Sequence, residues 1–127
     1  MIDRGLVLFV GVARDDTEQD VKYVVRKISE LRIFPDAAGR FDKSLRDIDG
    51  DVMLVSQFTL LAQTKRGRRP NFEGAMSPEL AVEVFNQVVK GFKETGLFVA
   101  VGRFGANMDV SLLNDGPVTI LVDSQGI

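Results

Sequence analysis

The chain contains neither cysteine nor histidine among its 127 residues. Without cysteine there is no disulfide framework, no thiolate nucleophile and no zinc–thiolate site, and this composition fits a cytoplasmic protein. Without histidine, Ser-His-Asp and Cys-His catalysis and histidine-based metal sites are excluded as well. An enzyme of this composition works with hydroxyls, amides, carboxylates, backbone groups or the substrate itself. No other ligand cluster stands out, so we expect neither a metal nor a cofactor.

The chain also lacks a strong net charge and a long apolar run. Its formal net charge is −2, so there is no overall nucleic-acid signature and any basic site must be local. No apolar run approaches the length of a transmembrane helix. The apolar residues 6–10 are soon followed by Asp15 and Asp16, and this is not the pattern of a signal peptide.

The length suits one domain over residues 1–127, and the chain pattern predicts an α+β fold. Apolar residues at helical spacing predict one helix from about 17 to 31 and another that begins at Ser77 and Pro78. Asp49-Gly50 is a two-residue hairpin signal. We therefore expect an antiparallel or mixed, barrel-like sheet with two main helices packed on it. The predicted strands cover residues 5–12, 32–34, 41–48, 51–58, 97–104, 108–113 and 118–123.

Residues 52–60 begin as a buried strand and end in the polar side chains Ser56, Gln57 and Thr59. Buried polar groups need a partner, which is either nearby backbone or a ligand. A strongly basic loop follows, with Lys65, Arg66, Arg68 and Arg69, and Phe72 in it could stack on a base. The loop is either a solvated charge run or a contact for nucleic-acid phosphates. The sequence thus predicts that an anionic ligand binds where the strand meets the loop.

Other candidates carry weaker signals. Pro117 stands at the entrance of an apolar strand, where a cis bond would point backbone carbonyls in a fixed direction. Phe58, Phe104 and Met108 are core residues by default. The spacing of the carboxylates supports no specific acid pair, and Asp109, Asp115 and Asp123 are interpreted as surface or turn residues.

Four motifs together resemble one family. They are S-Q-F-T-L at 56–60, K-R-G-R-R-P-N-F at 65–72, F-G-A-N-M-D-V at 104–110 and N-D-G-P-V-T at 114–119. In order and spacing they are similar to the D-aminoacyl-tRNA deacylases, formerly called D-tyrosyl-tRNA deacylases. The resemblance covers nearly the whole chain, and the first and last motifs together are specific.

The resemblance implies a tRNA-editing esterase. Such enzymes are cytoplasmic homodimers that hydrolyse the ester between a D-amino acid and tRNA, release the D-amino acid and free tRNA, and reject L-aminoacyl-tRNA. Glycyl-tRNA mischarged on tRNA-Ala is the expected second substrate. Gly116 and Pro117 match the Gly-cisPro motif, which enters the partner subunit's pocket, holds the α-amino group and excludes an L side chain.

The resemblance also assigns the pocket. Ser56, Gln57, Phe58 and Thr59 match the catalytic motif, whose amides stabilise the developing oxyanion. Phe104 and Met108 match the region that holds the terminal adenosine, and the four cations of the loop would contact the tRNA. The family implies no essential side-chain acid, base or nucleophile, because the ribose 2′-hydroxyl of the substrate helps to activate water.

Family members usually begin with a strand hairpin before the segment that matches residues 5–12, and roughly two dozen residues, about two strands, are missing here. The loss of two strands would expose a sheet edge. A second hypothesis is therefore a non-catalytic module that binds the 3′ end of tRNA or another RNA, with salt-sensitive binding and no ester cleavage. A third is a structural oligomeric domain without affinity for tRNA.

Overall fold

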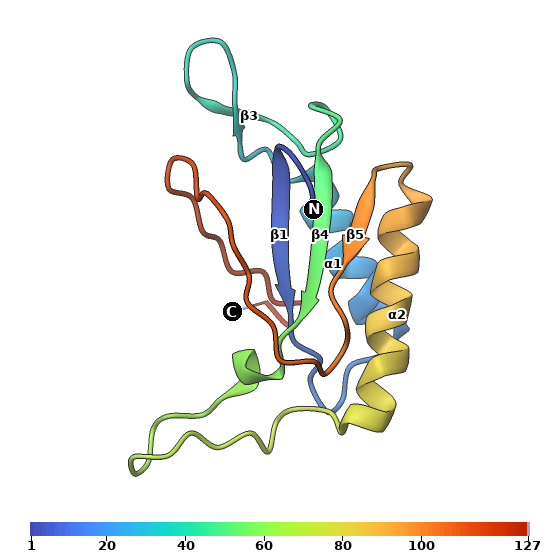
Figure 1. Cartoon of the computed structure of the whole chain (residues 1–127), viewed down its shortest axis with the longest axis vertical. Helices are drawn as coiled ribbons and strands as arrows, with labels where there is room; N and C mark the ends of the chain where they lie inside the picture. The colour runs from blue at the N-terminus through green and yellow to red at the C-terminus, as the bar shows by residue number, and fades with distance from the viewer. Residues whose placement is uncertain (127) are drawn as a thin grey trace.

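In the computed structural model, which describes residues 1–126, a small parallel sheet lies against two helices (Figure 1). The sheet has the strand order β1-β4-β5. The strands are β1 (Gly5–Val10), β4 (Asp51–Ser56) and β5 (Val99–Val101). Both neighbouring pairs are parallel, with Gly5 opposite Asp51 and Val52 opposite Val99. All three strands therefore end at the same edge of the sheet.

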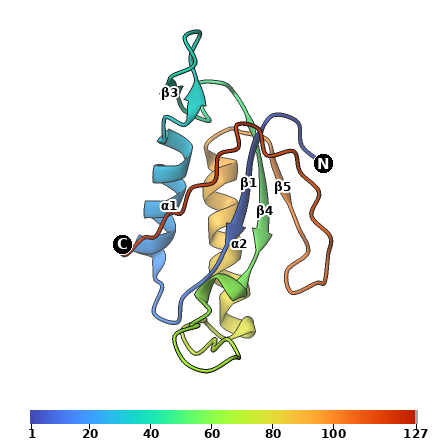
Figure 2. The ribbon, with the colours of Figure 1, turned by 90° about the vertical axis from the view of Figure 1, so that its left-hand side faces the viewer.

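The helices α1 (Glu18–Glu30) and α2 (Pro78–Glu94) pack on one another and cover one face of this sheet (Figure 2). The sequence prediction of two helices is confirmed, with bounds within one residue of those expected for α1. Thr17 precedes α1, and its backbone N–H donates to the Asp20 carboxylate over 2.7 Å. Pro78 occupies the first turn of α2, where its missing N–H removes no helical hydrogen bond.

The core fills the space between β4 and α2. Val52 and Leu54 of the central strand are fully buried, and so is Phe92 of the helix, whose apolar stripe faces the sheet. Burial of each such side chain contributes about 1.5–3 kcal/mol. The other buried members of this cluster are Val21, Phe34, Leu45, Phe85, Val88 and Leu97.

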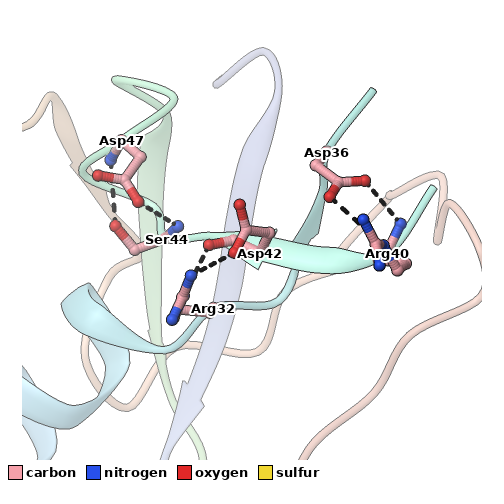
Figure 3. A network of polar contacts seen from close by, with 6 residues as sticks. All are labelled: Arg32, Asp36, Arg40, Asp42, Ser44 and Asp47. Atoms are coloured by element: carbon pink, nitrogen blue, oxygen red, sulfur yellow. Dashed lines mark hydrogen bonds and ion pairs between the residues drawn. The ribbon is translucent and has the colours of Figure 1, made fainter. Parts of the chain in front are cut away.

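The predicted hairpin at Asp49-Gly50 is wrong. The strand β3 (Phe41–Lys43) ends early and pairs only with β2 (Phe34–Pro35). The Ser44 N–H then donates to the Asp47 carboxylate over 2.9 Å, and the Asp47 N–H donates to the Ser44 hydroxyl over 3.1 Å (Figure 3). This reciprocal cap starts a helical turn. Asp49, at φ 49°, closes that turn, because its N–H donates to Arg46 and that of Gly50 to Leu45. β4 then enters a parallel sheet.

The short β2–β3 hairpin is held by exposed ion pairs. Arg32 bonds Asp42 with its guanidinium, and Asp36 accepts a hydrogen bond from the Arg40 backbone over 2.9 Å (Figure 3). The hydrogen bond from the Ser44 backbone lowers the pKa of Asp47 below its ordinary value. Exposed pairs of this kind contribute little free energy, and the hairpin is tied to the core by the buried Phe34 of β2.

The fold class is confirmed as α+β, with parallel and antiparallel strand pairs. The sheet does not close into the expected barrel over residues 1–126. The strands predicted at 108–113 and 118–123 are wrong, because these segments bond to no neighbouring strand over the described residues. The chain after β5 instead crosses beside β1 to the start of α1, where the Gln125 side chain donates to Asp20 over 2.8 Å (Figure 2). Neither helix in residues 1–126 is both long and apolar enough to cross a membrane.

Candidate functional site

The candidate site lies where the parallel strands end. Val10 and Ser56, the last residues of β1 and β4, are paired in register. The N–H of Gln57 then donates to Val10 over 2.8 Å, and that of Gly102, directly after β5, donates to Leu54 over 2.8 Å. In open parallel sheets, ligands bind beyond the carboxyl ends of the strands. The sequence predicted an antiparallel or mixed sheet, and a purely antiparallel arrangement would not have brought these three ends together.

Residues 56–59 present hydroxyl, amide and aromatic groups at this edge. Ser56 and Gln57 are half-buried, whereas Phe58 and Thr59 are exposed on the short 3-10 helix η1 (Phe58–Leu61). The Gln57 side-chain amide donates to the Thr59 hydroxyl. The structure therefore brings the four predicted catalytic residues into one cluster, in which the Gln57 and Thr59 side chains orient one another.

Gly11 is a site residue that the sequence analysis missed. A Cβ at this position would lie 2.5 Å from Leu61 Cδ2, 3.1 Å from Leu60 Cβ and 3.2 Å from the Gln57 carbonyl oxygen. The close approach of η1 to the end of β1 therefore depends on glycine at position 11. The available signal was a glycine inside the strand predicted over residues 5–12, because a glycine in a strand often marks a close backbone approach.

The basic loop forms an arm, residues 63–74, that extends away from the sheet (Figure 1). Its two ends are joined, because Gln63 and Asn71 exchange backbone hydrogen bonds of 2.7 and 2.9 Å. A second pair joins the arm to the segment after β1, where Arg14 donates to Gly74 over 2.8 Å and Met76 to Val12 over 3.0 Å. The exposed cations of this basic arm are Lys65, Arg66, Arg68 and Arg69.

The basic arm reaches the catalytic cluster through two aromatic rings. Phe72 is half-buried, and its ring centroid lies 5.1 Å from that of Phe58 in an edge-to-face arrangement. Pairs of this geometry are favourable beyond their buried area. The base of the basic arm is thus in contact with residues 56–59.

The predicted adenosine-binding residues lie beyond β5. Phe104 is half-buried, and its ring packs on Phe85 of the core at 5.7 Å between centroids. The Met108 side chain covers Gly102, where its sulfur would lie 3.2 Å from an added Cβ. Both residues therefore lie near the carboxyl end of β5, and the Phe104 ring packs partly into the core. Their contact with adenosine stays a prediction.

Gly116 and Pro117 lie apart in space from the catalytic cluster of residues 56–59. Their peptide bond is cis, which is one of the alternatives that the sequence left open. They occupy an exposed turn in which the Asn114 side chain donates to Thr119 Oγ1 over 3.0 Å and accepts from the Val118 N–H over 3.3 Å. In Figure 1 this turn lies near the start of β1, whereas η1 lies beyond its end. Within one chain, the turn and the catalytic cluster are separate.

Carboxylates gather at the start of α1. Partial burial raises the pKa of Asp16, with further contributions from Asp20 and Asp123. The pKa of Asp20 is lowered, chiefly by the Thr17 backbone N–H and then by the Ser124 side chain. Over residues 1–126 no three acidic side chains are placed to hold a metal ion. This cluster, which the sequence analysis missed, holds the C-terminal segment in place.

A family model described as D-Tyr-tRNA(Tyr) deacylase matches residues 1–123 of the chain. Among curated relatives, the D-aminoacyl-tRNA deacylase of Aquifex aeolicus is 51% identical over 126 residues, covering 99% of this chain and 85% of the relative. That of Halothermothrix orenii is 50% identical over 123 residues, covering 97% and 83%. That of Halalkalibacterium halodurans is 48% identical over 124 residues, covering 98% and 85%.

Two solved structures share the fold. The c-Myc DNA unwinding element binding protein superposes with a TM-score of 0.87 at 38% identity, covering 94% of this chain and 81% of that one. A probable eukaryotic D-amino acid tRNA deacylase superposes with a TM-score of 0.72 at 15% identity, covering 84% and 77%. At that identity, the second likeness concerns the fold alone.

Proposed function

Since the chain belongs to the D-Tyr-tRNA(Tyr) deacylase family, we propose that it is a tRNA-editing esterase that hydrolyses D-aminoacyl-tRNA and spares the L form. Glycyl-tRNA mischarged on tRNA-Ala is the second substrate. The observation that carries the proposal is the placement of residues 56–59 beside the basic arm at one sheet edge. Residues 1–127 act as one domain, in the cytoplasm, where aminoacyl-tRNA is used.

In this reaction the polar cluster orients the ester instead of attacking it. The Gln57 amide and the Thr59 hydroxyl, already joined, fix the geometry of the pocket, and nearby amides stabilise the oxyanion as water adds to the carbonyl carbon. The carbon–oxygen bond to the ribose then breaks, and the tRNA leaves as the alcohol. The substrate's 2′-hydroxyl assists the water, so no histidine or cysteine is required.

The tRNA end lies across the sheet edge. Phe104 and Met108 hold the terminal adenosine beyond β5, and the four cations of the basic arm contact backbone phosphates. Phosphate contacts are independent of sequence, so the arm positions the tRNA and the pocket selects the amino acid.

The active form is a homodimer in which Gly116 and Pro117 enter the partner's pocket. Their distance from residues 56–59 within one chain supports this, because a turn that selects the substrate must reach a pocket. The segments flanking the turn expose large apolar side chains, among them Leu113 at 93% and Leu121 at 71%. An apolar surface of this kind marks an interface. Replacement of Leu113 by glutamate should shift the dimer to monomer in sedimentation velocity and abolish cleavage.

The decisive experiment is deacylation of matched D- and L-tyrosyl-tRNA, with glycyl-tRNA alongside. We expect cleavage of the D ester and of glycyl-tRNA, with the L ester intact. Alanine at both Gln57 and Thr59 should abolish cleavage, whereas alanine at the remote, exposed Phe41 should not. A wild-type chain that binds tRNA and leaves all three esters intact would refute the esterase.

The alternative is a non-catalytic nucleic-acid-binding homologue. It is favoured by the basic arm and by the structural relative whose name refers to binding of a DNA unwinding element. This alternative predicts salt-sensitive binding of tRNA or another nucleic acid with no D-ester cleavage at any enzyme concentration.

A further inference from the structure

We propose that Phe72 is a positioning residue that holds the Phe58 ring and thereby couples the basic arm to the catalytic cluster. The inference rests on the proposed function and adds a residue to it. Its basis is the edge-to-face contact of the two rings, 5.1 Å between centroids, across the gap between the arm and η1.

Phe72 is itself fixed on both sides. Before it, Asn71 exchanges two backbone hydrogen bonds with Gln63, and its side-chain oxygen accepts the Glu73 N–H over 2.7 Å. After it, the Ala75 N–H donates to the Phe72 carbonyl over 3.0 Å. The backbone that carries Phe72 is therefore held in a closed turn, which fixes the point from which the ring reaches Phe58.

Phe58 needs such a support. Its side chain is 58% exposed, so the core does not fix its ring. It begins η1 and directly follows Gln57, so a displaced ring would move the backbone that places the Gln57 amide against Thr59. A catalytic group must be held close to its productive position, and support from the residues behind it is what achieves this.

The consequence is a link between tRNA binding and catalysis. Lys65, Arg66, Arg68 and Arg69 stand at the tip of the same closed arm whose base carries Phe72. A phosphate backbone that settles on the tip restrains the arm, and the arm then restrains Phe58. We expect substrates with a tRNA body to be cleaved with a higher kcat than an aminoacyl-adenosine.

The kinetic test compares Phe72→Ala with wild type on D-tyrosyl-tRNA and on D-tyrosyl-adenosine, which is too short to reach the arm. A positioning role predicts a kcat about three- to tenfold lower on both substrates, with recovery in Phe72→Tyr, which keeps the ring. Phe41→Ala, which truncates a phenylalanine exposed to 57%, is the matched control and should leave kcat unchanged. A rise in KM for the tRNA alone would show an RNA contact and overturn the proposal.

A double-mutant cycle tests the coupling directly. In a Phe58→Ala background, Phe72→Ala should have no further effect on kcat, because the ring that it supports is gone. Effects of the two changes that multiply independently would contradict the proposal.

A measurement without turnover separates this inference from the proposed function. Amide hydrogen exchange should accelerate at Leu60 and Ala62, whose N–H groups bond Gln57 and Thr59, in Phe72→Ala and not in Phe41→Ala. Unchanged exchange at both amides would overturn the positioning role even in an active enzyme. Accelerated exchange in a chain that cleaves no ester would support the positioning role while refuting the esterase.

Discussion

Gln57 donates its backbone N–H to the carbonyl of Val10 over 2.8 Å, so the first residue beyond β4 is tied to the last residue of β1. This bond continues the parallel ladder by one step, past the pairing of Val10 with Ser56. The start of the catalytic cluster is thus held by the sheet, whereas its exposed part, from Phe58 onward, depends on contacts outside the sheet.

Gly11→Ala should displace η1. The added Cβ would overlap Leu61 Cδ2 at 2.5 Å and crowd Leu60 and the Gln57 carbonyl. We expect a loss of about 1–3 kcal/mol in the free energy of unfolding, and a fall of about 10- to 100-fold in kcat/KM on D-aminoacyl-tRNA. Gly74→Ala is the control, since its nearest atom, the Leu61 carbonyl oxygen, lies 4.0 Å away. Equal kinetics for the two variants would contradict the role of Gly11.

Gly116→Ala should weaken the rejection of L-aminoacyl-tRNA. Gly116 has φ 122°, and a Cβ there would lie 2.8 Å from Val118 Cγ2, so the turn must change shape. We expect the ratio of D- to L-ester cleavage to fall about tenfold, which corresponds to a loss of about 1.4 kcal/mol of discrimination. The thermal midpoint should fall as well, because an alanine at this φ is strained even in an exposed turn.

A matched control for this change is Gly39→Ala in the β2–β3 hairpin. Gly39 has φ 81°, so alanine meets a similar backbone penalty, but no atom lies within 4 Å of the added Cβ. An unchanged D-to-L ratio in Gly116→Ala would argue against selection by this turn, and a changed ratio in Gly39→Ala would point to a general loss of stability.

Replacement of Arg68 and Arg69 by glutamine should weaken tRNA binding in a salt-dependent way. Each lost phosphate contact should reduce the slope of log K against log salt by about 0.7–0.9. The control replaces Lys90 and Lys93, exposed cations of α2, with glutamine and makes the same change in net charge. Fluorescence anisotropy over a range of salt concentrations measures both. If the two double variants show the same slope, the basic arm is a solvated charge run.

Asp16→Asn should stabilise the protein at neutral pH. The pKa of Asp16 is raised, first by burial and then by the carboxylates around it, so the folded state holds the Asp16 proton more tightly than the unfolded state. The wild type therefore loses stability as the pH rises above about 4, the ordinary value for aspartate. Asparagine has no such loss and can still accept the 2.8 Å bond from Ala13. The difference in thermal midpoint should be positive at pH 7 and vanish at acid pH.

The lowered pKa of Asp20 acts in the opposite direction. The Thr17 N–H favours the carboxylate, so this contribution to stability is present above about pH 4 and is lost as the pH falls through the lower folded-state pKa. Asp20→Asn should therefore reduce the thermal midpoint at pH 7, with the opposite sign to Asp16→Asn. Two variants that shifted the midpoint in the same direction at pH 7 would contradict this assignment.

The sequence predicted the helices because their signals are local. The apolar stripe of α2 and Pro78 at its start depend only on neighbouring residues, and the helix is where they indicate. The residue types of the candidate site could also be predicted from the sequence, since Ser56 and Gln57 break an apolar run at the end of a strand. Their roles came from the resemblance of four motifs to a family.

The pairing of the strands could not be predicted from local sequence signals in the same way. Asp49-Gly50 reads as a hairpin turn, but the reciprocal bonds of Ser44 and Asp47 make it the end of a helical turn. The cap signal, a serine three residues before an aspartate, was present and was outweighed by the stronger dipeptide. The contact of Phe58 with Phe72 joins residues that are distant in sequence, and no periodicity predicts it.

Because the two ends of the basic arm are joined, the segment between them can be replaced as a unit. Gln63 and Asn71 are neighbours in space, so a replacement segment of another length or charge need only meet the same two backbone positions. The buried strands and α2 would be untouched by such a graft. Arms from different relatives could therefore be compared on one scaffold, which would separate the evolution of tRNA preference from that of the hydrolytic centre.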